Sequence, residues 1–260
     1  MRKIVKLLLI IFPRPFLIKL SLFLNKPISL FFKGDNVRCP VCEKSFKKFL
    51  PYGYAKANKD NRLCPSCLSL ERHRLLWMYL HNKTDFFNTK LDVLHIAPEQ
   101  PFIKRFKKIQ QLNYTSADLE SPIADIKTDI RDMNVFNDKE FDVIICNHVM
   151  EHIEEEQVAL KELLRVLKPG GWAILQVPID YSSESTFEDN SITDKRERER
   201  IFGQYDHVRV YGKDYPERLR KAGFEVIEDD YVHSFSEEEI DKYRLHKNEI
   251  IYLCLRPKVK

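Results

Sequence analysis

The chain has 260 residues, of which 43% are hydrophobic and 32% charged, and its formal net charge is +4. This composition excludes an intrinsically disordered chain and suits one α/β domain with a small additional module. The charge is unevenly distributed, because residues 1–83 contain 17 Lys/Arg and 4 Asp/Glu. Such a basic first third predicts contact with something anionic, a nucleic acid or an acidic membrane, unless the lysines merely keep a small domain soluble.

Residues 1–32 form a strongly apolar segment with scattered basic residues. Its uninterrupted apolar run, residues 7–12, is too short to span a bilayer, and Pro13 and Pro15 follow it. A secretory signal peptide is disfavoured, because no small-residue cleavage site follows the run. The segment then either lies on an anionic membrane surface or packs on the domain that follows. We favour the membrane, because so many large apolar side chains would otherwise need a dedicated groove.

The cysteines of the first third fall as two close pairs. Cys39-Pro-Val-Cys42 is followed by 21 residues and then by Cys64-Pro-Ser-Cys67. Each Cys-x-x-Cys places two thiolates at one turn, and two such turns complete a tetrahedral site. The spacing predicts a small zinc ribbon over residues 33–67, in which the four thiolates hold a structural Zn²⁺ ion. Nothing indicates a disulfide scaffold, so we expect a cytoplasmic protein, with any membrane contact at the inner face.

The aromatic residues of this ribbon have two interpretations. Phe46, Phe49, Tyr52 and Tyr54, interleaved with lysines, could stack on bases and accompany phosphate contacts. Alternatively they form the ribbon's own small core, which we favour. The two single cysteines, Cys146 and Cys254, fall in apparent buried strands and are expected to be reduced core residues.

A helix is predicted over residues 68–80, with Leu75, Leu76 and Tyr79 on its buried face. The three successive basic residues Arg72–Arg74 could reach an anionic ligand, but we expect them to form a solvated basic face. From residue 68 to residue 260 the pattern is that of one α/β domain, so we expect the ribbon to end at residue 67.

The next segments read as strands of an open sheet. Residues 91–97 are a short, largely apolar run that predicts the first strand, and residues 113–118 and 126–130 are expected to form the second and third strands. Only seven residues separate Asp118 from Ile126, so the usual connecting helix is expected to be shortened or lost.

The stretch over residues 141–179 has the strongest pattern. Residues 141–146 are an apolar, β-branched run typical of a buried parallel strand. Apolar residues at three- and four-residue steps then predict a helix; they are Val158, Leu160, Leu163, Leu164 and Leu167. Pro169-Gly170-Gly171 is expected to end this helix, and residues 172–177 read as a second buried strand. Strand, helix and strand make a βαβ crossover.

This stretch resembles the second half of the class I S-adenosylmethionine-dependent methyltransferase fold, in particular its type 11 small-molecule group. The resemblance lies in Phe141-Asp142, Met150-Glu151-His152-Ile153 and Arg165-Val-Leu-Lys-Pro-Gly-Gly171. It implies an α/β fold with a Rossmann-like seven-stranded sheet, whose closing antiparallel pair would be residues 224–231 and 250–255. It also implies methyltransferase activity with S-adenosyl-L-methionine as the cofactor.

The resemblance places the cofactor at the carboxyl ends of the strands. The family normally carries alternating glycines after the first strand, and here those positions hold His95, Ala97, Glu99 and Pro101. An acid at the end of the second strand can accept the ribose hydroxyls, and a further acid matches the position that contacts adenine. The implied cofactor-binding residues are His95, Ala97, Glu99, Asp118, Asp129, Asn147 and Glu151.

A long polar insertion covers residues 182–214. Loops at the carboxyl edge of an α/β sheet commonly build substrate sites. The segment Gln204-Tyr-Asp-His-Val-Arg-Val-Tyr211 resembles the His-x-Arg-x-Tyr that often precedes the next helix in the type 11 group. That helix is predicted over residues 215–222, ended by Gly223. Further on, Ser236-Glu-Glu-Glu239 has the form of a capping box.

Methyl transfer from a sulfonium is an in-line displacement that must align two atoms and remove a proton from the acceptor. Histidine titrates near neutrality and is the natural base, so the candidates are His148, His152 and His207. We choose His207 first, because Arg209 and Tyr211 follow it and are expected to bind an anionic substrate. His152 has the alternative role of bonding the backbone at its turn.

We therefore expect methylation of a small-molecule or lipid-linked acceptor. A second interpretation is RNA methylation, because a basic zinc ribbon ahead of such a domain also resembles a group of ribosomal RNA guanine methyltransferases. A third is a non-catalytic binding protein whose cofactor site has degenerated with its glycines.

Overall fold

The computed structural model describes residues 27–53 and 59–258. The membrane contact predicted for residues 1–32 therefore falls mostly outside the described residues. Within the described part, none of the helices combines the length and apolarity that crossing a bilayer requires. The chain divides into two compact units. We call them the cysteine unit (residues up to 85, 100–104 and 231–249) and the sheet unit (residues 86–99, 105–230 and from 250 onward). The predicted boundary at residue 67 stays a prediction.

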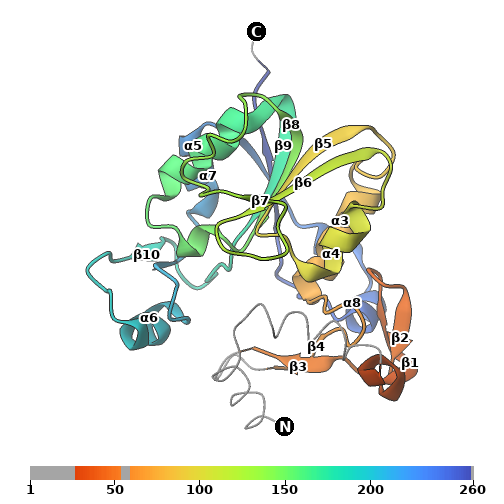
Figure 1. Cartoon of the computed structure of the whole chain (residues 1–260). Helices are drawn as coiled ribbons and strands as arrows, with labels where there is room; N and C mark the ends of the chain where they lie inside the picture. The colour runs from red at the N-terminus through yellow and green to blue at the C-terminus, as the bar shows by residue number, and fades with distance from the viewer. Residues whose placement is uncertain (1–26, 54–58, 259–260) are drawn as a thin grey trace. The chain divides into compact units, whose positions relative to one another are not determined.

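The cysteine unit is built from two short antiparallel hairpins and small helices (Figure 1). Its elements are β1 (Lys33–Cys39), β2 (Lys44–Phe46), β3 (Leu50–Tyr52), β4 (Lys59–Leu63), α3 (Glu71–Asn82), the 3-10 turn η3 (Tyr231–Ser234) and α8 (Glu237–Tyr243). Phe46 and Phe49 are fully buried, so the expectation that the aromatics form the module's own core is confirmed for these two. The capping box predicted at Ser236 and Glu239 is also present, because each side chain bonds the other's backbone.

The expected solvated basic face of α3 is wrong at His73, which is 5% exposed, and at Arg74, whose exposed fraction is 0%. Its guanidinium donates to four backbone carbonyls. The acceptors are the oxygens of Arg62 (3.0 Å), Ser69 (2.9 Å), Tyr243 (2.6 Å) and Arg244 (2.9 Å). Tyr243 and Arg244 are at the end of α8, Arg62 is in β4, and Ser69 lies just before α3. Buried carbonyls at such positions need donors, and the planar fork of an arginine can satisfy several at once.

The sheet unit contains the predicted seven-stranded sheet, in the order β12-β13-β9-β8-β5-β6-β7 (Figure 1). Its strands are β5 (Leu91–Ile96), β6 (Leu112–Asp118), β7 (Ile126–Lys127), β8 (Phe141–Asn147), β9 (Leu167–Gln176), β12 (Glu225–Asp229) and β13 (Ile251–Leu255). The five strands β5 to β9 are parallel, while β13 pairs antiparallel with both β9 and β12. The Rossmann-like α/β fold and its closing antiparallel pair are thus confirmed.

The crossover helix α5 (Glu156–Val166) ends earlier than predicted, and β9 begins at once at Leu167. Leu167 already pairs with Phe141 of β8, so Pro169-Gly170-Gly171 lies within the strand rather than ending the helix. The terminal carbonyls of α5 are satisfied from elsewhere in the chain. Arg256 donates to the oxygens of Leu164, Arg165 and Leu167. A distant arginine therefore closes this helix, not a glycine cap.

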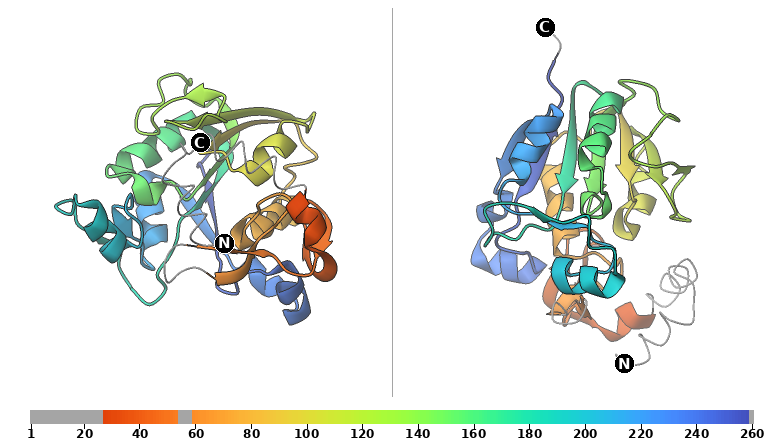
Figure 2. Two further views of the ribbon diagram at one scale, coloured as in Figure 1. Left: turned by 60° about the horizontal axis from the view of Figure 1, so that its bottom comes forward. Right: turned by 90° about the vertical axis from the view of Figure 1, so that its left-hand side faces the viewer.

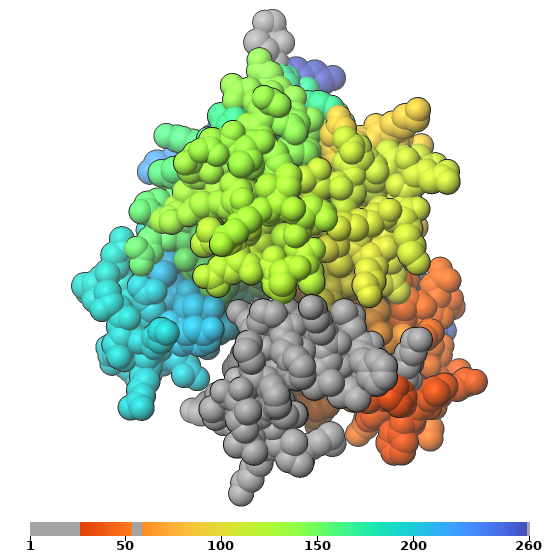
Figure 3. Space-filling model, viewed as in Figure 1, coloured from red at the N-terminus to blue at the C-terminus, as the bar shows by residue number. Residues whose placement is uncertain are grey.

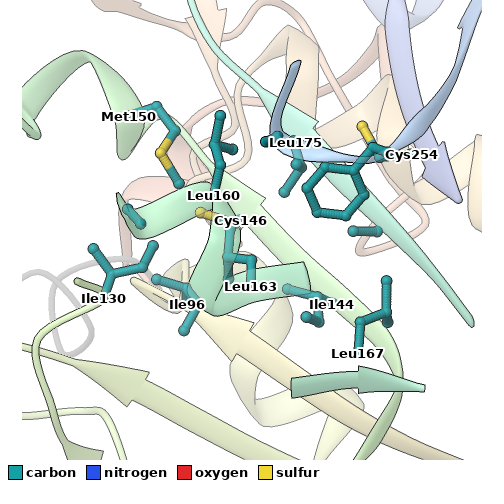
Figure 4. Close-up of a cluster of buried hydrophobic side chains, with 14 of the residues drawn as sticks. Ile96, Ile130, Ile144, Cys146, Met150, Leu160, Leu163, Leu167, Leu175 and Cys254 are labelled. Carbon is teal, nitrogen blue, oxygen red and sulfur yellow. The ribbon is translucent and has the colours of Figure 1, made fainter. Parts of the chain in front are cut away.

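The main core lies between the sheet and the helices α5 and α7 (Tyr215–Ala222). Figure 4 shows Ile96, Ile144 and Cys146 of the strands meeting Leu160 and Leu163 of α5. Cys146 and Cys254 are buried and unpaired with each other, as predicted. One residue of the predicted apolar face of α5, Val158, is 47% exposed instead.

The connection after β6 replaces a helix with an irregular segment, which was predicted from its short length. β7 is only two residues long, so most of the predicted strand over residues 126–130 is absent. Figure 3 shows residues 119–140 spread over the visible face of the sheet unit. Ile130, Met133 and Phe136 attach this segment to the core.

The long insertion has local structure of its own. It contains β10 (Phe187–Glu188), α6 (Lys195–Phe202) and β11 (Arg209–Val210), and β10 pairs antiparallel with β11. Figure 2 shows β10 and α6, in cyan, standing away from the sheet. The remaining helix α4 (Gln100–Phe106) has its residues divided between the two units.

Candidate functional site

The parallel strands bring the predicted cofactor residues to one edge of the sheet. Ile96 at the end of β5 is level with Ala117 of β6 and with Cys146 of β8. The residues that follow these three positions are Ala97, Asp118 and Asn147. Ligands of open α/β sheets bind at this carboxyl edge.

A chain of buried polar groups runs along this edge. His95, which is fully buried, lies 2.8 Å from the hydroxyl of Tyr114 through Nδ1 and 2.6 Å from Glu99 Oε2 through Nε2. Asn147 Nδ2 donates to the other oxygen of Glu99 at 3.2 Å. Among the described residues, no partner reaches Asn147 Oδ1, which is buried. His95 therefore positions Glu99, and Asn147 presents an unpaired acceptor.

Two turns at this edge adopt left-handed backbone without glycine. Ala97, after β5, has φ of 49°, and His148, after β8, has φ of 55°. A non-glycine residue in this region carries strain of order 1 kcal/mol, and such residues cluster at functional sites. The corner that lacks the family's glycines thus still makes a left-handed turn at Ala97.

The two predicted acids occupy turns. Asp118 Oδ1 accepts from the backbone amides of Glu120 and Ser121 at 2.7 and 2.6 Å. Asp129 is paired with Arg131, whose guanidinium lowers the pKa of the Asp129 carboxyl. Both acids therefore stabilise a turn through contacts within the protein. Their contact with a cofactor stays a prediction.

The three predicted histidines gather around Glu151 in the sheet unit. Glu151 and His152 belong to the 3-10 turn η2 (Met150–His152), and His207 lies in the loop after α6. Glu151, His152 and His207 each offer one ligand atom, and these three atoms lie within 4.8 Å of one another. The rings of His152 and His207 meet edge to face, with centroids 4.8 Å apart. His148 Nδ1 lies 3.2 Å from Glu151 Oε1.

Backbone carbonyls fix the orientation of two of these imidazoles. His152 Nδ1 lies 3.1 Å from the oxygen of Asp206, and His207 Nδ1 lies 3.2 Å from the oxygen of Phe202. A carbonyl only accepts, so each Nδ1 donates a proton, and Nε2 is the nitrogen whose lone pair is available in the neutral ring. His207 Nε2 and Glu151 Oε2 are buried and have no hydrogen-bond partner in the described part of the chain.

Burial and charge act in opposite senses on this cluster. Burial lowers the pKa of His207, and the Glu151 carboxylate offsets only part of that effect. Burial would raise the pKa of Glu151, but the hydrogen bond from His148 and the charges of His148 and His152 lower it overall. His207 is therefore neutral and Glu151 ionised near pH 7.

The insertion is attached to η2 by Arg209, whose exposed fraction is 2%. Its guanidinium donates to the oxygens of Met150 (2.7 Å), Ile153 (2.6 Å) and Glu154 (3.0 Å). Beside it, the amide of Val208 donates to the Glu151 oxygen at 2.9 Å. These bonds place His207 next to Glu151, although the two are far apart in sequence.

Tyr211, the other predicted substrate residue, is also fully buried. Its hydroxyl donates to Glu156 Oε1 at 2.6 Å, and Arg218 Nε donates to Glu156 Oε2 at 2.8 Å. The polar groups of Arg209 and Tyr211 thus bind the protein itself, and their contact with a substrate stays a prediction. Sequence reasoning missed Glu156 and Asp206, although Asp206 stands directly before His207 and an acid opens the α5 helix.

The four paired cysteines meet in the cysteine unit. Cys39 Sγ lies 3.6 Å from Cys67 Sγ, and Cys42 Sγ lies 3.7 Å from Cys64 Sγ. All four sulfurs lie within 4.8 Å of one another, and none is in a disulfide. Ser69 Oγ lies 3.1 Å from Cys39 Sγ and 3.3 Å from Cys67 Sγ.

Comparison with known families gives one match. Residues 84–175 match the family model described as a methyltransferase domain, of type 11. This stretch contains β5, β6, β8, α5 and η2, so it includes the strands and the turn described above. The match confirms, for residues 84–175, the resemblance to type 11 methyltransferase domains expected from the sequence. No curated protein matches the chain.

Solved structures with a similar fold are all distant in sequence. The [4+2]-cyclase SpnF is 17% identical, with a TM-score of 0.49, and the match covers 74% of this chain and 84% of that one. A SAM dependent methyltransferase from Archaeoglobus fulgidus is 15% identical, with a TM-score of 0.44 and coverages of 70% and 93%. The Burkholderia thailandensis 1,6-didemethyltoxoflavin-N1-methyltransferase, with its substrate and S-adenosylhomocysteine bound, is 13% identical, with a TM-score of 0.45 and coverages of 71% and 76%.

Proposed function

We propose that this chain is an S-adenosylmethionine-dependent methyltransferase that methylates a hydroxyl or amine of a small-molecule or lipid-linked acceptor. The observation that carries the proposal is a set of buried, unpaired polar atoms beside the carboxyl end of β8. They are Asn147 Oδ1, Glu151 Oε2 and His207 Nε2. Buried polar atoms are rarely left without partners, so such a group indicates that ligands complete their hydrogen bonds.

The residues at the sheet edge fit the cofactor. The unpaired Asn147 Oδ1 is an acceptor for an ammonium group, and Glu99, held by His95 and Asn147, adds a negative charge beside it. Asp118 stands at the end of β6, where an acid can accept ribose hydroxyls. When bound, S-adenosylmethionine supplies an electrophilic methyl group on a sulfonium.

The histidine cluster supports the proton transfer that the acceptor requires. The acceptor's O–H or N–H bond breaks and the proton leaves, a bond to the methyl carbon forms, and the C–S bond breaks to release S-adenosylhomocysteine. His207 carries an unprotonated, unpaired Nε2, and His152 lies beside it. A neutral imidazole of this kind is a suitable general base near pH 7.

Calorimetry tests the cofactor site. We expect the full chain to bind S-adenosylmethionine, and Asn147→Ala to weaken binding about tenfold, because one hydrogen bond to a charged group is worth roughly 1.5–3 kcal/mol. Asn134→Ala, at an exposed asparagine of the same unit, is the matched control and should bind like the wild type. Absence of binding at millimolar cofactor would favour the non-catalytic interpretation.

Release of S-adenosylhomocysteine with a panel of phenolic, carboxylic and amine acceptors tests the reaction. His207→Gln should keep cofactor binding but lose at least about 100-fold in kcat, the range of general-base catalysis. Full turnover in both His207→Gln and His152→Gln would show that the proton leaves by another route.

We infer that the four cysteine sulfurs hold a structural Zn²⁺ ion. In a tetrahedral site with Zn–S bonds of about 2.3 Å the sulfurs are about 3.8 Å apart, close to the 3.6 and 3.7 Å measured here. Ser69 can donate to the thiolates, as outer groups of zinc sites do. Elemental analysis should find one zinc that Cys64→Ser loses, and a chain that is folded and zinc-free as purified would contradict the inference.

The cysteine unit gives less support to RNA as the acceptor. Phe46 and Phe49 are buried in its core, which leaves them unable to stack on bases. The acceptor is therefore proposed as small or lipid-linked, in a cytoplasmic enzyme that touches an anionic membrane through residues 1–32. Sedimentation with anionic vesicles tests the membrane contact, and a full chain that stays in the supernatant with and without vesicles would contradict it.

A further inference from the structure

A second metal-binding arrangement lies in the sheet unit, at the cluster of Glu151, His152 and His207. We propose that these three residues bind a divalent transition-metal ion, separate from the cysteine site. Two histidines and one carboxylate form the ligand set of catalytic zinc sites and of open mononuclear iron sites. Such sites leave at least one position for water or substrate.

The hydrogen bonds of the cluster leave suitable ligand atoms for a metal ion. Both histidines donate through Nδ1 to backbone carbonyls, of Asp206 and Phe202, so Nε2 is the nitrogen that carries the lone pair. Metal-binding histidines characteristically make this second hydrogen bond, which fixes the tautomer and the ring. Glu151 likewise has one oxygen with a partner and one without. Its Oε1 accepts from His148, and its Oε2 is buried and unpaired in the described structure.

The distances require only local adjustment. Two ligands of a tetrahedral ion with bonds of about 2.1 Å are about 3.4 Å apart. Glu151, His152 and His207 each offer one ligand atom, and these atoms already lie within 4.8 Å of one another. Small side-chain rotations of His152, which is about one-third exposed, would close the gap. The backbone of the site is held by Arg209 and by the Val208 amide, so the ligands come from anchored segments.

Bound here, the ion gives the acceptor site a chemical preference. An oxygen of the acceptor can take the open position, where a divalent cation lowers the pKa of a bound hydroxyl. With the ion bound, His207 Nε2 is a ligand and no longer the general base, so the acceptor loses its proton to solvent and attacks as an oxyanion. The inferred substrate class is accordingly an oxygen nucleophile, a hydroxyl or carboxylate, rather than an amine. This role, unlike the metal binding itself, rests on the proposed function.

Cobalt(II) titration of the full chain tests the site without turnover. Cobalt at the cysteines gives intense thiolate charge-transfer absorption, whereas cobalt at nitrogen and oxygen ligands adds only weaker d–d bands. We expect the wild type to bind a second cobalt ion that adds only the weaker d–d bands of nitrogen and oxygen ligands. His207→Gln and Glu151→Gln should each weaken that ion at least about 100-fold and keep the thiolate bands. His246→Ala, at an exposed histidine of the cysteine unit, should change neither.

Two results would overturn the inference. One is the absence of a second cobalt ion in the wild type at millimolar cobalt, with the thiolate bands and circular dichroism showing folded protein. The other is equal cobalt binding by His207→Gln and the wild type. Methyl transfer that is unchanged after the second ion is removed would refute its catalytic role while leaving the proposed function intact. Failure to bind S-adenosylmethionine would count against the proposed function and not against the cobalt result.

Discussion

Replacing Arg74 with methionine should lower the urea concentration at which the cysteine unit unfolds. Methionine keeps the apolar stem of the side chain and removes the guanidinium, which binds four carbonyls and lies 4.4 Å from the centre of the Phe49 ring. Buried carbonyls that lose a charged donor cost stability, because water cannot replace it.

The magnitude follows from two opposing contributions. Four hydrogen bonds from a charged donor, at roughly 1.5 kcal/mol each, total about 6 kcal/mol. Burial lowers the pKa of Arg74 to about 10, and at about 1.4 kcal/mol for each unit this buried charge costs about 3 kcal/mol, which methionine relieves. The net loss is about 3 kcal/mol. With a urea dependence of about 1.5 kcal/mol/M, the midpoint should fall by about 2 M.

The two tryptophans allow the unit to be observed by itself. Trp77 lies in α3 of the cysteine unit and Trp172 in β9 of the sheet unit, so fluorescence in a Trp172→Phe background reports the cysteine unit alone. Arg38→Met, at an exposed arginine of β1, is the matched control and should shift the midpoint by less than about 0.5 M. An equally small shift for Arg74→Met would refute the reasoning.

Two further predictions concern the sheet unit. Tyr211→Phe should lower the free energy of unfolding by about 2 kcal/mol, because it leaves a buried oxygen of Glu156 without its donor; a urea midpoint equal to that of the wild type would contradict this. Lys168 donates to Asp92 and Asp142 and lowers the pKa of Asp92. A lowered folded pKa gives stability above the ordinary value, near 4, that is lost as pH falls through the folded value. The melting temperature of Lys168→Met should therefore be lower than that of the wild type at pH 7, and the difference should shrink as the pH falls below about 4; a constant difference would exclude the ion pairs as the cause.

The strands could be predicted from the sequence because their signal is local. Short β-branched runs at residues 91–97 and 141–146 are read from neighbouring side chains alone, and both are buried parallel strands. The end of α5 could not be predicted, because the group that satisfies its last carbonyls is Arg256, about ninety residues later in the chain. The burial of Arg74 was missed for the same reason, since two of its acceptors are Tyr243 and Arg244.

In the candidate site, too, some features could be predicted from local sequence and others depend on contacts between distant residues. The motif around Glu151 and His152 pointed to one part of the cluster, and the segment around His207 to the other. Sequence alone gave no means of knowing that each Nδ1 is held by a carbonyl, because hydrogen-bond partners are fixed only when the insertion folds onto η2. Asn147 and Glu99 are a second case, since their bond joins the end of β8 to the loop after β5, 48 positions apart.

The position of Arg209 bears on how the cluster can act. The sequence favoured this arginine as a substrate contact, yet its guanidinium donates to the Glu188 carboxylate and to three carbonyls around η2. Those bonds attach the His207 segment to the turn that carries Glu151 and His152. Loosening them should separate the ligands before it affects the sheet, because α5, β8 and β9 have their own apolar core. Arg209→Lys, which cannot bridge three carbonyls, should therefore lose the second cobalt ion while keeping the fluorescence of Trp172 and the binding of S-adenosylmethionine. Loss of all three together would instead mean that the insertion is part of the fold's stability and not a separate support for the cluster.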